Sequence, residues 1–285
     1  MVTAPEFSLL LPVYAGDDPS FLRLAFESTV DKQTLRPTEA VIVQDGPVPE
    51  ALAAELARIE RESPVPVRIV RLPQNGGLTT ALNAGLDACA YPVVARMDAD
   101  DVSAPGRFAA QWELMSQGFD LVGTGMVEFE TDPDKVSAAR IPPTGQDRIR
   151  EHARTHNPFN HPTMMYRVAA LDAVGRYQPF GKMEDYWLGV RIIASGARVE
   201  NITEPLVKYR VGAGAFARRG GWQEAKTEWA LQREMLRIGF ITRGEYLRNV
   251  VVKGVYRLMP ASLKRVLFRR FVGSGLPGDK AAPSQ

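Results

Sequence analysis

Two hydrophobic periods alternate along the first 100 residues or so of the chain. Short apolar runs, which predict buried strands, are separated by longer segments in which apolar residues recur at helical spacing. Strands are expected at residues 7–14 with a break at Pro12, and at 40–44, 67–70 and 93–97; helices are expected from residue 19, at 49–61 and at 78–89. This alternation predicts an α/β fold with a mostly parallel sheet flanked by helices on both faces.

Polar side chains follow the predicted strands, at the end where each strand stops. The residues at these positions are Tyr14, Asp45, Arg71 and Asp98. Because ligands of parallel sheets bind outside the carboxyl ends of the strands, we expect these four side chains to border one site.

The run VVARMDADD at residues 93–101 carries the strongest chemical signal. Asp98 and Asp100 stand at alternate positions directly after a strand, so they share one face if the extended backbone continues. Carboxylates this close repel one another unless a cation lies between them, and Mg²⁺ and Mn²⁺ prefer such oxygen ligands. The alternative is an acidic turn in which Asp101 or Ser103 caps the next helix.

A second pair of acids opens a helix predicted to run to about residue 194. Glu184 and Asp185 occupy its first turn, where the helix dipole alone would favour negative charge. Residues 131–150, upstream of this helix, show no clear period and are expected as an exposed excursion.

The C-terminal part of the chain differs in character from the rest. A glycine-rich segment at 212–221 carries Arg218 and Arg219, which suit either a flap over a diphosphate or a plain linker. Beyond it the sequence becomes helical and increasingly basic. We therefore predict a catalytic domain over residues 1–221 and a helical, basic C-terminal extension over residues 222–285.

The composition is ordinary for a soluble globular protein, with 45% hydrophobic and 24% charged residues and a net charge of +2. Such a small net charge argues against nucleic acid as a partner. Cys89 is the only cysteine, which suits a reducing compartment, and no uncharged apolar stretch has membrane-spanning length. We expect a cytoplasmic protein.

Five motifs occur in the order typical of family 2 glycosyltransferases with the GT-A fold. They are LLPVY at Leu10–Tyr14, VIVQDG at Val41–Gly46, NGGLTTALNAG at Asn75–Gly85, RMDADD at Arg96–Asp101 and MEDYWL at Met183–Leu188. The chain resembles this family over residues 7–221. The segment NPFNHPTMMYR resembles, more narrowly, the branch that builds bacterial surface polysaccharides, of the amylovoran type. The resemblance implies transfer of a sugar from a nucleoside-diphosphate sugar, with UDP favoured, to a saccharide or polyprenyl-linked saccharide acceptor.

The resemblance also implies roles for individual residues. Asp45 would accept a hydrogen bond from the uracil N–H, although it also suits a plain turn. Asp98 and Asp100 would hold Mn²⁺ or Mg²⁺ on the donor diphosphate, Asp100 most directly. The residues expected to bind the nucleotide sugar are Pro12, Tyr14, Asp45, Arg71, Asn75, Gly77, Asn83, Asp98, Arg218 and Arg219.

In the same family one acid of the helix pair is the general base. Asp185 matches that position, Glu184 would orient the acceptor, and the direct attack that a base assists would invert the anomeric centre. The roles of His156 and His161 remain open between a metal ligand, an acceptor contact and a hydrogen-bonded loop residue.

Two other functions fit parts of the sequence. A sugar-phosphate nucleotidyltransferase also combines a nucleotide-binding fold with acidic metal ligands, but residues 12–18 lack the basic side chain that its first loop should carry. A nucleic-acid-binding module using the basic C-terminus is the other candidate, and no recognised motif supports it.

The last predicted helix lies within residues 260–272. Leu263, Val266, Leu267 and Phe271 fall at helical spacing among lysines and arginines. Such a helix suits peripheral attachment to an anionic membrane surface at the inner face of the cell membrane, or packing on the catalytic domain.

Overall fold

The computed structural model describes residues 5–212 and 222–258 of the 285-residue chain. The chain divides into two compact units, residues 1–215 and 216–285. The domain boundary that the sequence predicts between residues 221 and 222 stays a prediction.

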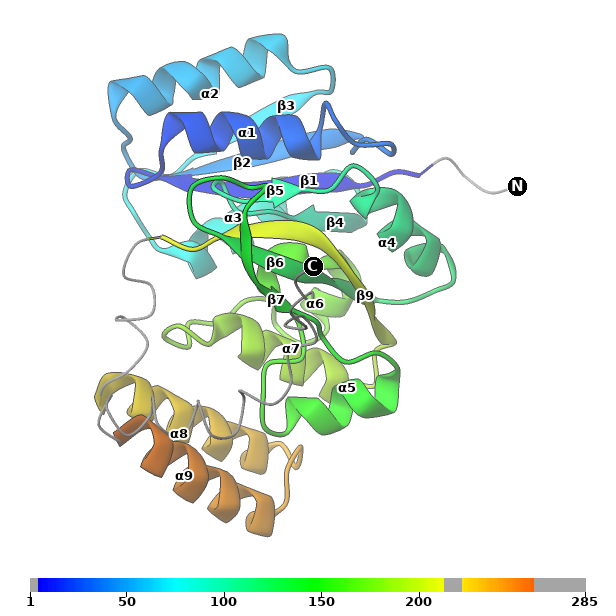
Figure 1. The fold of residues 1–285 in the computed structure, drawn as a ribbon, viewed down its shortest axis with the longest axis vertical. Helices are drawn as coiled ribbons and strands as arrows, with labels where there is room; N and C mark the ends of the chain where they lie inside the picture. Colours follow the sequence, from blue (N-terminus) through cyan, green and yellow to red (C-terminus); the bar gives the residue numbers. More distant parts are fainter. Residues whose placement is uncertain (1–4, 213–221, 259–285) are drawn as a thin grey trace, which may run out of the picture. The chain divides into compact units, whose positions relative to one another are not determined.

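Parallel strands form the first half of the sheet (Figure 1). They are β1 (Ser8–Tyr14), β2 (Glu39–Asp45), β3 (Val67–Arg71) and β4 (Val93–Arg96), arranged in the order β3-β2-β1-β4. They alternate with α1 (Pro19–Thr29), α2 (Glu50–Glu62) and α3 (Leu78–Ala88). These bounds follow the predicted ones closely because each element carries its own hydrophobic period.

Pro12 does not break β1, contrary to the expectation. The strand pairs with β2 as far as Tyr14, but with β4 only as far as Leu10. The carbonyl of Leu10 accepts the N–H of Met97 at 3.0 Å, so the backbone polar groups of Leu10 point towards the β4 side of the strand. The backbone of Pro12, two residues later, is turned to the same side. Because β4 has ended there, the missing N–H of Pro12 costs no ladder hydrogen bond.

The second half of the sheet is mixed. The order continues from β4 through β8 (Met165–Arg167), β6 (Leu121–Phe129) and β9 (Val199–Arg210) to β5 (Val102–Ser103), and β7 (Val136–Arg140) pairs with β6. β6 and β9 run parallel, whereas β8, β5 and β7 are antiparallel to their neighbours. The connecting helices are α4 (Arg107–Ser116), α5 (Gln146–Ala153), the short η1 (His161–Thr163), α6 (Val168–Asp172) and α7 (Glu184–Ala194).

Most of residues 131–150 are exposed, as the sequence indicated, but β7 and the first half of α5 lie within them. Four of the five residues of β7 are exposed, so the strand pairs through its backbone and shows no hydrophobic alternation. A strand without a buried face leaves no periodic signal in the sequence.

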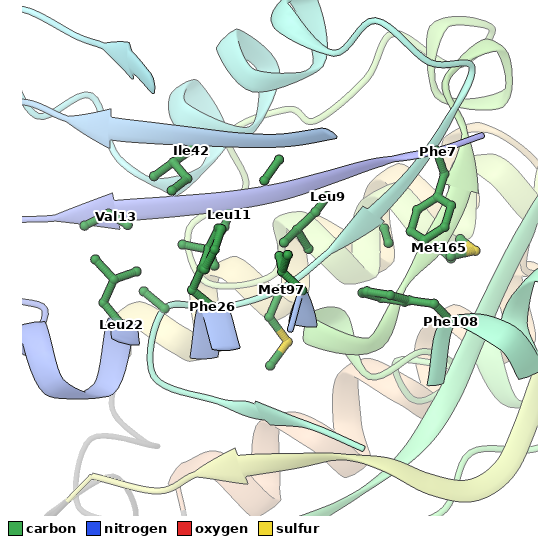
Figure 2. Close-up of a cluster of buried hydrophobic side chains, with 14 of the residues drawn as sticks. Phe7, Leu9, Leu11, Val13, Leu22, Phe26, Ile42, Met97, Phe108 and Met165 are labelled. Atoms are coloured by element: carbon green, nitrogen blue, oxygen red, sulfur yellow. The ribbon is translucent and has the colours of Figure 1, made fainter. Parts of the chain in front are cut away.

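The main hydrophobic core lies on one face of the first half-sheet (Figure 2). Phe7, which precedes β1, and alternate residues of β1 up to Val13 pack there with Leu22 and Phe26 of α1. The ring centroids of Phe7 and Phe108 lie 5.2 Å apart. Full burial of one such side chain contributes about 1.5–3 kcal/mol.

The opposite face of the same half-sheet is covered by α3, which approaches it closely. A methyl group at Gly85 would lie 2.2 Å from Cδ1 of Leu10 and 2.9 Å from Cγ2 of Val43. The helix can therefore pack at this distance only because residue 85 has no side chain.

The second unit contains a pair of helices, α8 (Trp222–Arg237) and α9 (Arg243–Leu258). A capping box starts α9, in which Thr242 N–H donates to Glu245 at 2.8 Å and Glu245 N–H donates to the Thr242 hydroxyl at 3.3 Å. A buried hydrogen bond of 2.9 Å from Asn249 to Gln232 joins the two helices. Across the described ranges no helix combines the length and apolar character needed to cross a bilayer.

Candidate active site

A cleft of about 570 Å³ lies between the end of β4 and the first turn of α7. Asp98, which follows β4, lines it together with Glu184 and Asp185. The fold thus brings together two acidic sites that are more than 80 residues apart in the sequence. Asp100 and the predicted base-pocket residues Tyr14 and Asp45 are not part of this lining.

The acidic loop after β4 is anchored by a buried arginine. Both guanidinium Nη atoms of Arg96 donate to the carboxylate of Asp98, at 3.2 and 2.5 Å, and Arg96 is only 1% exposed. Asp98 is therefore held in one orientation before any ligand binds. The sequence did not assign a role to Arg96.

Asp101 does not cap a helix, because the residue at the N-cap of α4 is Gly106. Asp101 is fully buried, and its Oδ1 accepts the backbone N–H of Arg210 at 2.8 Å. The side chain of Arg210 also donates to the carbonyl of Asp100 at 3.0 Å, and its guanidinium lies 3.7 Å from the ring centroid of Phe21. Arg210, at the end of β9, thus fixes the acidic loop to α1.

The carboxylate of Asp100 fits a divalent cation. Burial, together with the nearby charge of Asp98, raises the pKa of Asp100 to about 6. Burial also raises the pKa of Asp17, with smaller contributions from Asp100 and Asp98, to about 7. Each of these carboxyls would be stabilised in its ionised form by a bound cation.

Within the described residues no three His, Cys, Asp or Glu side chains form a metal site on their own. A cation at Asp100 would therefore take its remaining ligands from water and the phosphates of the donor, as Mg²⁺ commonly does. The carboxylate of Asp98 is already paired with Arg96, and its contact with the metal stays a prediction.

The nucleotide end of the predicted site lies at the ends of β1, β2 and β3. Tyr14 is 50% exposed, and its ring packs on Gly16, where a methyl group would lie 2.6 Å from ring atoms. Arg71 is exposed at the end of β3, and Pro12 is buried within β1. Tyr14 therefore presents an open aromatic face that a base can stack on.

Asp45 has a structural role that the sequence did not indicate. It is 4% exposed, and its two oxygens accept the N–H groups of Gly76 and Gly77 at 2.7 and 2.9 Å. The Asn75 amide donates to the Asp45 carbonyl at 3.4 Å. Asp45 thus fixes the loop in which Gly77 adopts φ +81°, and its contact with uracil stays a prediction.

Asn83 bonds to the backbone of Tyr177. Its amide donates to the Tyr177 carbonyl at 2.9 Å and accepts the Tyr177 N–H at 3.2 Å. The structure therefore gives Asn83 two backbone partners, and its contact with the nucleotide sugar stays a prediction. Tyr177 in turn contacts Nε2 of His161 through its hydroxyl, at 3.1 Å.

The acid pair occupies the first turn of α7, and the N-cap residue Met183 makes no side-chain capping bond. Oδ2 of Asp185 accepts a hydrogen bond from Asn157 at 2.7 Å, and Oδ1 accepts the N–H of Tyr186 at 2.8 Å. Burial raises the pKa of both Glu184 and Asp185, and Oε2 of Glu184 is buried without a hydrogen-bond partner. Buried carboxylates beside a cleft are typical of functional sites.

All three histidines of the chain line the cleft. Burial, and then the charge of Arg96, lowers the pKa of His161, which agrees with the hydrogen-bonded alternative for this residue. The rings of His152 and His156 stack with centroids 5.1 Å apart. No motif pointed to His152, although its spacing of four residues from His156 places both rings on one face of a helix.

Two predicted features lie outside the described residues. They are Arg218 and Arg219 of the proposed flap, and the basic helix within 260–272.

The α/β sheet, with an acidic loop after a central strand and a second pair of acids lining the same cleft, defines a GT-A nucleotide-sugar transferase. The sequence model described as Glycosyl transferase family 2 matches residues 8–175. The chain belongs to this family and is a glycosyltransferase, which confirms the predicted fold and enzyme class and excludes the nucleotidyltransferase alternative. Glu184 and Asp185 lie beyond the matched residues.

Characterised and uncharacterised relatives match nearly the whole chain. The amylovoran biosynthesis glycosyltransferase AmsE of Erwinia amylovora is 37% identical over 269 residues, which cover 93% of this chain and 98% of that protein. An uncharacterized glycosyltransferase of Haemophilus influenzae is 36% identical, with 94% and 99% covered. The UDP-Gal:alpha-D-GlcNAc-diphosphoundecaprenol beta-1,3-galactosyltransferase of Escherichia coli is 30% identical, with 94% and 97% covered.

Solved structures share the fold at low sequence identity. Residues 1–349 of S. aureus TarS, in complex with UDP-GlcNAc, align with a TM-score of 0.66 at 15% identity over 93% of this chain and 75% of that one. The mannosyltransferase PcManGT from Pyrobaculum calidifontis, in complex with GDP-Man and Mn²⁺, aligns with a TM-score of 0.64 at 15% identity, covering 97% and 77%. At this identity the likeness establishes the fold alone.

Proposed function

We propose that the chain transfers a sugar from a UDP-sugar, with inversion, to a lipid-linked saccharide during the synthesis of a bacterial surface polysaccharide. One observation carries the proposal: a single cleft joins Asp98 of the acidic loop to Asp185 on α7. The relatives in E. amylovora and E. coli support the pathway, and the E. coli relative supports both the UDP-linked donor and the acceptor on a diphosphate-linked lipid.

The donor would lie along the carboxyl ends of the first strands. Tyr14 stacks on the base, the loop held by Asp45 approaches the nucleotide, and Asp98 accepts hydrogen bonds from the donor. Asp100 would hold the divalent cation, Mn²⁺ or Mg²⁺, which neutralises charge on the departing diphosphate. Arg210 and Arg96 keep the loop in place for this contact.

Asp185 would act as the general base. It takes the proton of the acceptor hydroxyl while that oxygen bonds to the anomeric carbon and the bond to the diphosphate breaks on the opposite face, so the anomeric centre is inverted. Asn157 and the Tyr186 N–H hold both carboxylate oxygens in place. Glu184, whose Oε2 has no hydrogen-bond partner, would orient the acceptor.

Ligand binding tests the donor half of this proposal. UDP, GDP and dTDP are titrated into the full chain by calorimetry, with and without Mn²⁺. We expect UDP to bind tightest and only with the cation, and Asp100→Ala to remove the effect of Mn²⁺. Tighter binding of GDP or dTDP would overturn the choice of uridine, and binding unaffected by Mn²⁺ would overturn the metal.

The second unit carries a surface that suits a membrane-bound acceptor. Leu247, Val251 and Val252 on α9 are 64%, 52% and 61% exposed, and the first two are one helical turn apart. With the basic segment that follows, this face would lie on an anionic membrane surface.

Sedimentation with vesicles tests the membrane attachment. The full chain should bind vesicles that contain anionic lipid, and Leu247→Gln with Val251→Gln, or truncation after Met259, should weaken binding. Val136→Gln is the matched control, because Val136 is 54% exposed but lies on β7 in the other unit. Equal binding by all variants, or none by the full chain at low salt, would remove the membrane from the proposal.

A further inference from the structure

Part of the cleft lining is basic and takes no part in the steps proposed above. Arg140, His152, His156 and Lys182 line the same cleft as the acid pair. They come from the end of β7, the end of α5 with the turn that follows it, and the loop before α7. We call these four residues the basic cluster. Basic side chains brought together from separate segments beside a catalytic site indicate that an anion binds there.

Hydrogen bonds hold the histidine-bearing turn against the general base. The buried hydroxyl of Tyr186 donates to the carbonyl of Ala153 at 2.9 Å, and Asn157 donates to Asp185 at 2.7 Å. His152 directly precedes Ala153 and His156 directly precedes Asn157, so each histidine is next to a residue that bonds to the first turn of α7. A molecule whose hydroxyl meets Asp185 can therefore reach the histidine pair with a neighbouring group.

The histidine pair itself suits an anionic ligand. The two rings stack at 5.1 Å with an interplanar angle of 30°, and the Thr155 hydroxyl holds Nδ1 of His156 at 2.9 Å. Burial, and then the proximity of His156, lowers the pKa of His152, because two imidazolium ions repel one another. A phosphate beside them reverses this effect by pairing with both charges.

The other two members are an arginine and a lysine. Arg140 is ion-paired with buried Glu128, and its guanidinium lies 5.4 Å from the ring centroid of Tyr209. Lys182 is exposed and lines the cleft. The cluster thus combines a planar guanidinium with a compact ammonium charge, and both kinds of group bind phosphate in proteins.

We propose that the basic cluster binds the phosphate or diphosphate that links the acceptor sugar to its lipid. The inference rests on the proposed function, in which the donor diphosphate lies at Asp98 and Asp100 and the acceptor hydroxyl at Asp185. The cluster would then hold the acceptor by its anionic end while the hydroxyl is presented to the base. Saccharides that lack this group would bind weakly.

The three histidines of the chain allow a direct test by imidazole NMR. Methylenediphosphonate is titrated into the full chain in the presence of EDTA, and the signals are assigned with single His→Gln variants. We expect the His152 and His156 signals to move and saturate, while that of His161, held by Tyr177, stays in place. His152→Gln, His156→Gln and Lys182→Gln should each weaken binding roughly tenfold, the loss of one hydrogen bond to a charged group.

Arg148→Gln is the matched control, because Arg148 lies on α5 but is exposed and does not line the cleft. Its affinity for methylenediphosphonate should equal that of the wild type. Unchanged affinity in both histidine variants, or movement of the His161 signal alone, would overturn the proposal. Tighter binding of glucuronate than of the diphosphonate would assign the cluster to a carboxylate and overturn the phosphate.

A parallel titration of UDP with Mn²⁺ separates this inference from the proposed function. The variants of the basic cluster should bind UDP as the wild type does. If they lose UDP in proportion to the diphosphonate, the cluster belongs to the donor site and the inference is wrong. If the wild type binds no UDP, the proposed function fails, whatever the diphosphonate shows.

Discussion

Exchanging the two partners of one hydrogen bond tests whether Asp185 is the general base. Asp185→Asn removes the proton acceptor, and a positioned base contributes ~10²–10⁴-fold, or about 3–5 kcal/mol of activation free energy. An asparagine at residue 185 has only one acceptor oxygen, so it cannot accept both the Nδ2 donor of Asn157, now at 2.7 Å, and the Tyr186 N–H, now at 2.8 Å. Leaving one of these donors unsatisfied costs up to about 1–3 kcal/mol of stability. A lower activity of Asp185→Asn could therefore come from the missing base or from the lost hydrogen bond.

The double variant Asn157→Asp with Asp185→Asn separates these two losses. Its carboxylate at residue 157 can accept from the introduced amide and still accept the Phe159 N–H, which now bonds to Asn157 at 3.3 Å. We expect the melting temperature to return to the wild-type value while kcat stays at least about a hundredfold low, because the carboxylate no longer stands on α7.

Turnover with saturating donor and acceptor, thermal unfolding and UDP affinity are measured on the wild type, on Asp185→Asn and on the double variant. Affinity for UDP with Mn²⁺ should be equal in all three proteins. Recovery of kcat in the double variant would show that the loss was structural and refute the base. A fall in UDP affinity as large as the fall in kcat would make Asp185 a binding residue.

Three further results are expected. Asp100→Ala should abolish the Mn²⁺-dependent binding of UDP measured by calorimetry, with Asp98→Ala close behind; full transfer activity in Asp100→Ala would exclude it as the metal ligand. Burial raises the pKa of Asp185, and only its ionised form accepts a proton, so kcat should fall as the pH drops through that raised pKa. Asn157→Leu removes a hydrogen bond that lowers this pKa, so it should move the acidic side of the pH–kcat profile to higher pH. An acidic side that does not move would show that another group titrates. Gly85→Ala should lower the free energy of unfolding, measured with denaturant, by about 1–3 kcal/mol, because its methyl group would lie 2.2 Å from Leu10. Gly106→Ala, where the added methyl group would have no atom within 4 Å, should leave the stability nearly unchanged. Equal stability of the two variants would show that α3 shifts freely.

The spacing of neighbouring residues predicted most of the strands and helices of this protein and the positions of its acids. The alternation of periods located β1 to β4 and their helices, because each of these elements buries one face and so repeats its apolar residues at its own spacing. The spacing of Asp98 and Asp100 and the position of Asp185 at a helix start likewise needed only neighbouring residues. β7, which buries no side-chain face, was missed for the same reason.

The partners of these residues were decided by the tertiary structure alone. Asp45 accepts the backbone N–H groups of Gly76 and Gly77, about 30 residues away in the sequence. Asn157 donates a hydrogen bond to Asp185, which is 28 residues away. No periodicity encodes such pairs, because they depend on where strand ends and loops meet once the sheet has curled. The sequence therefore determined which acids this enzyme carries and on which elements. The fold decided which of them are anchored by the protein and which face the cleft, because burial and hydrogen bonding are properties of the assembled site.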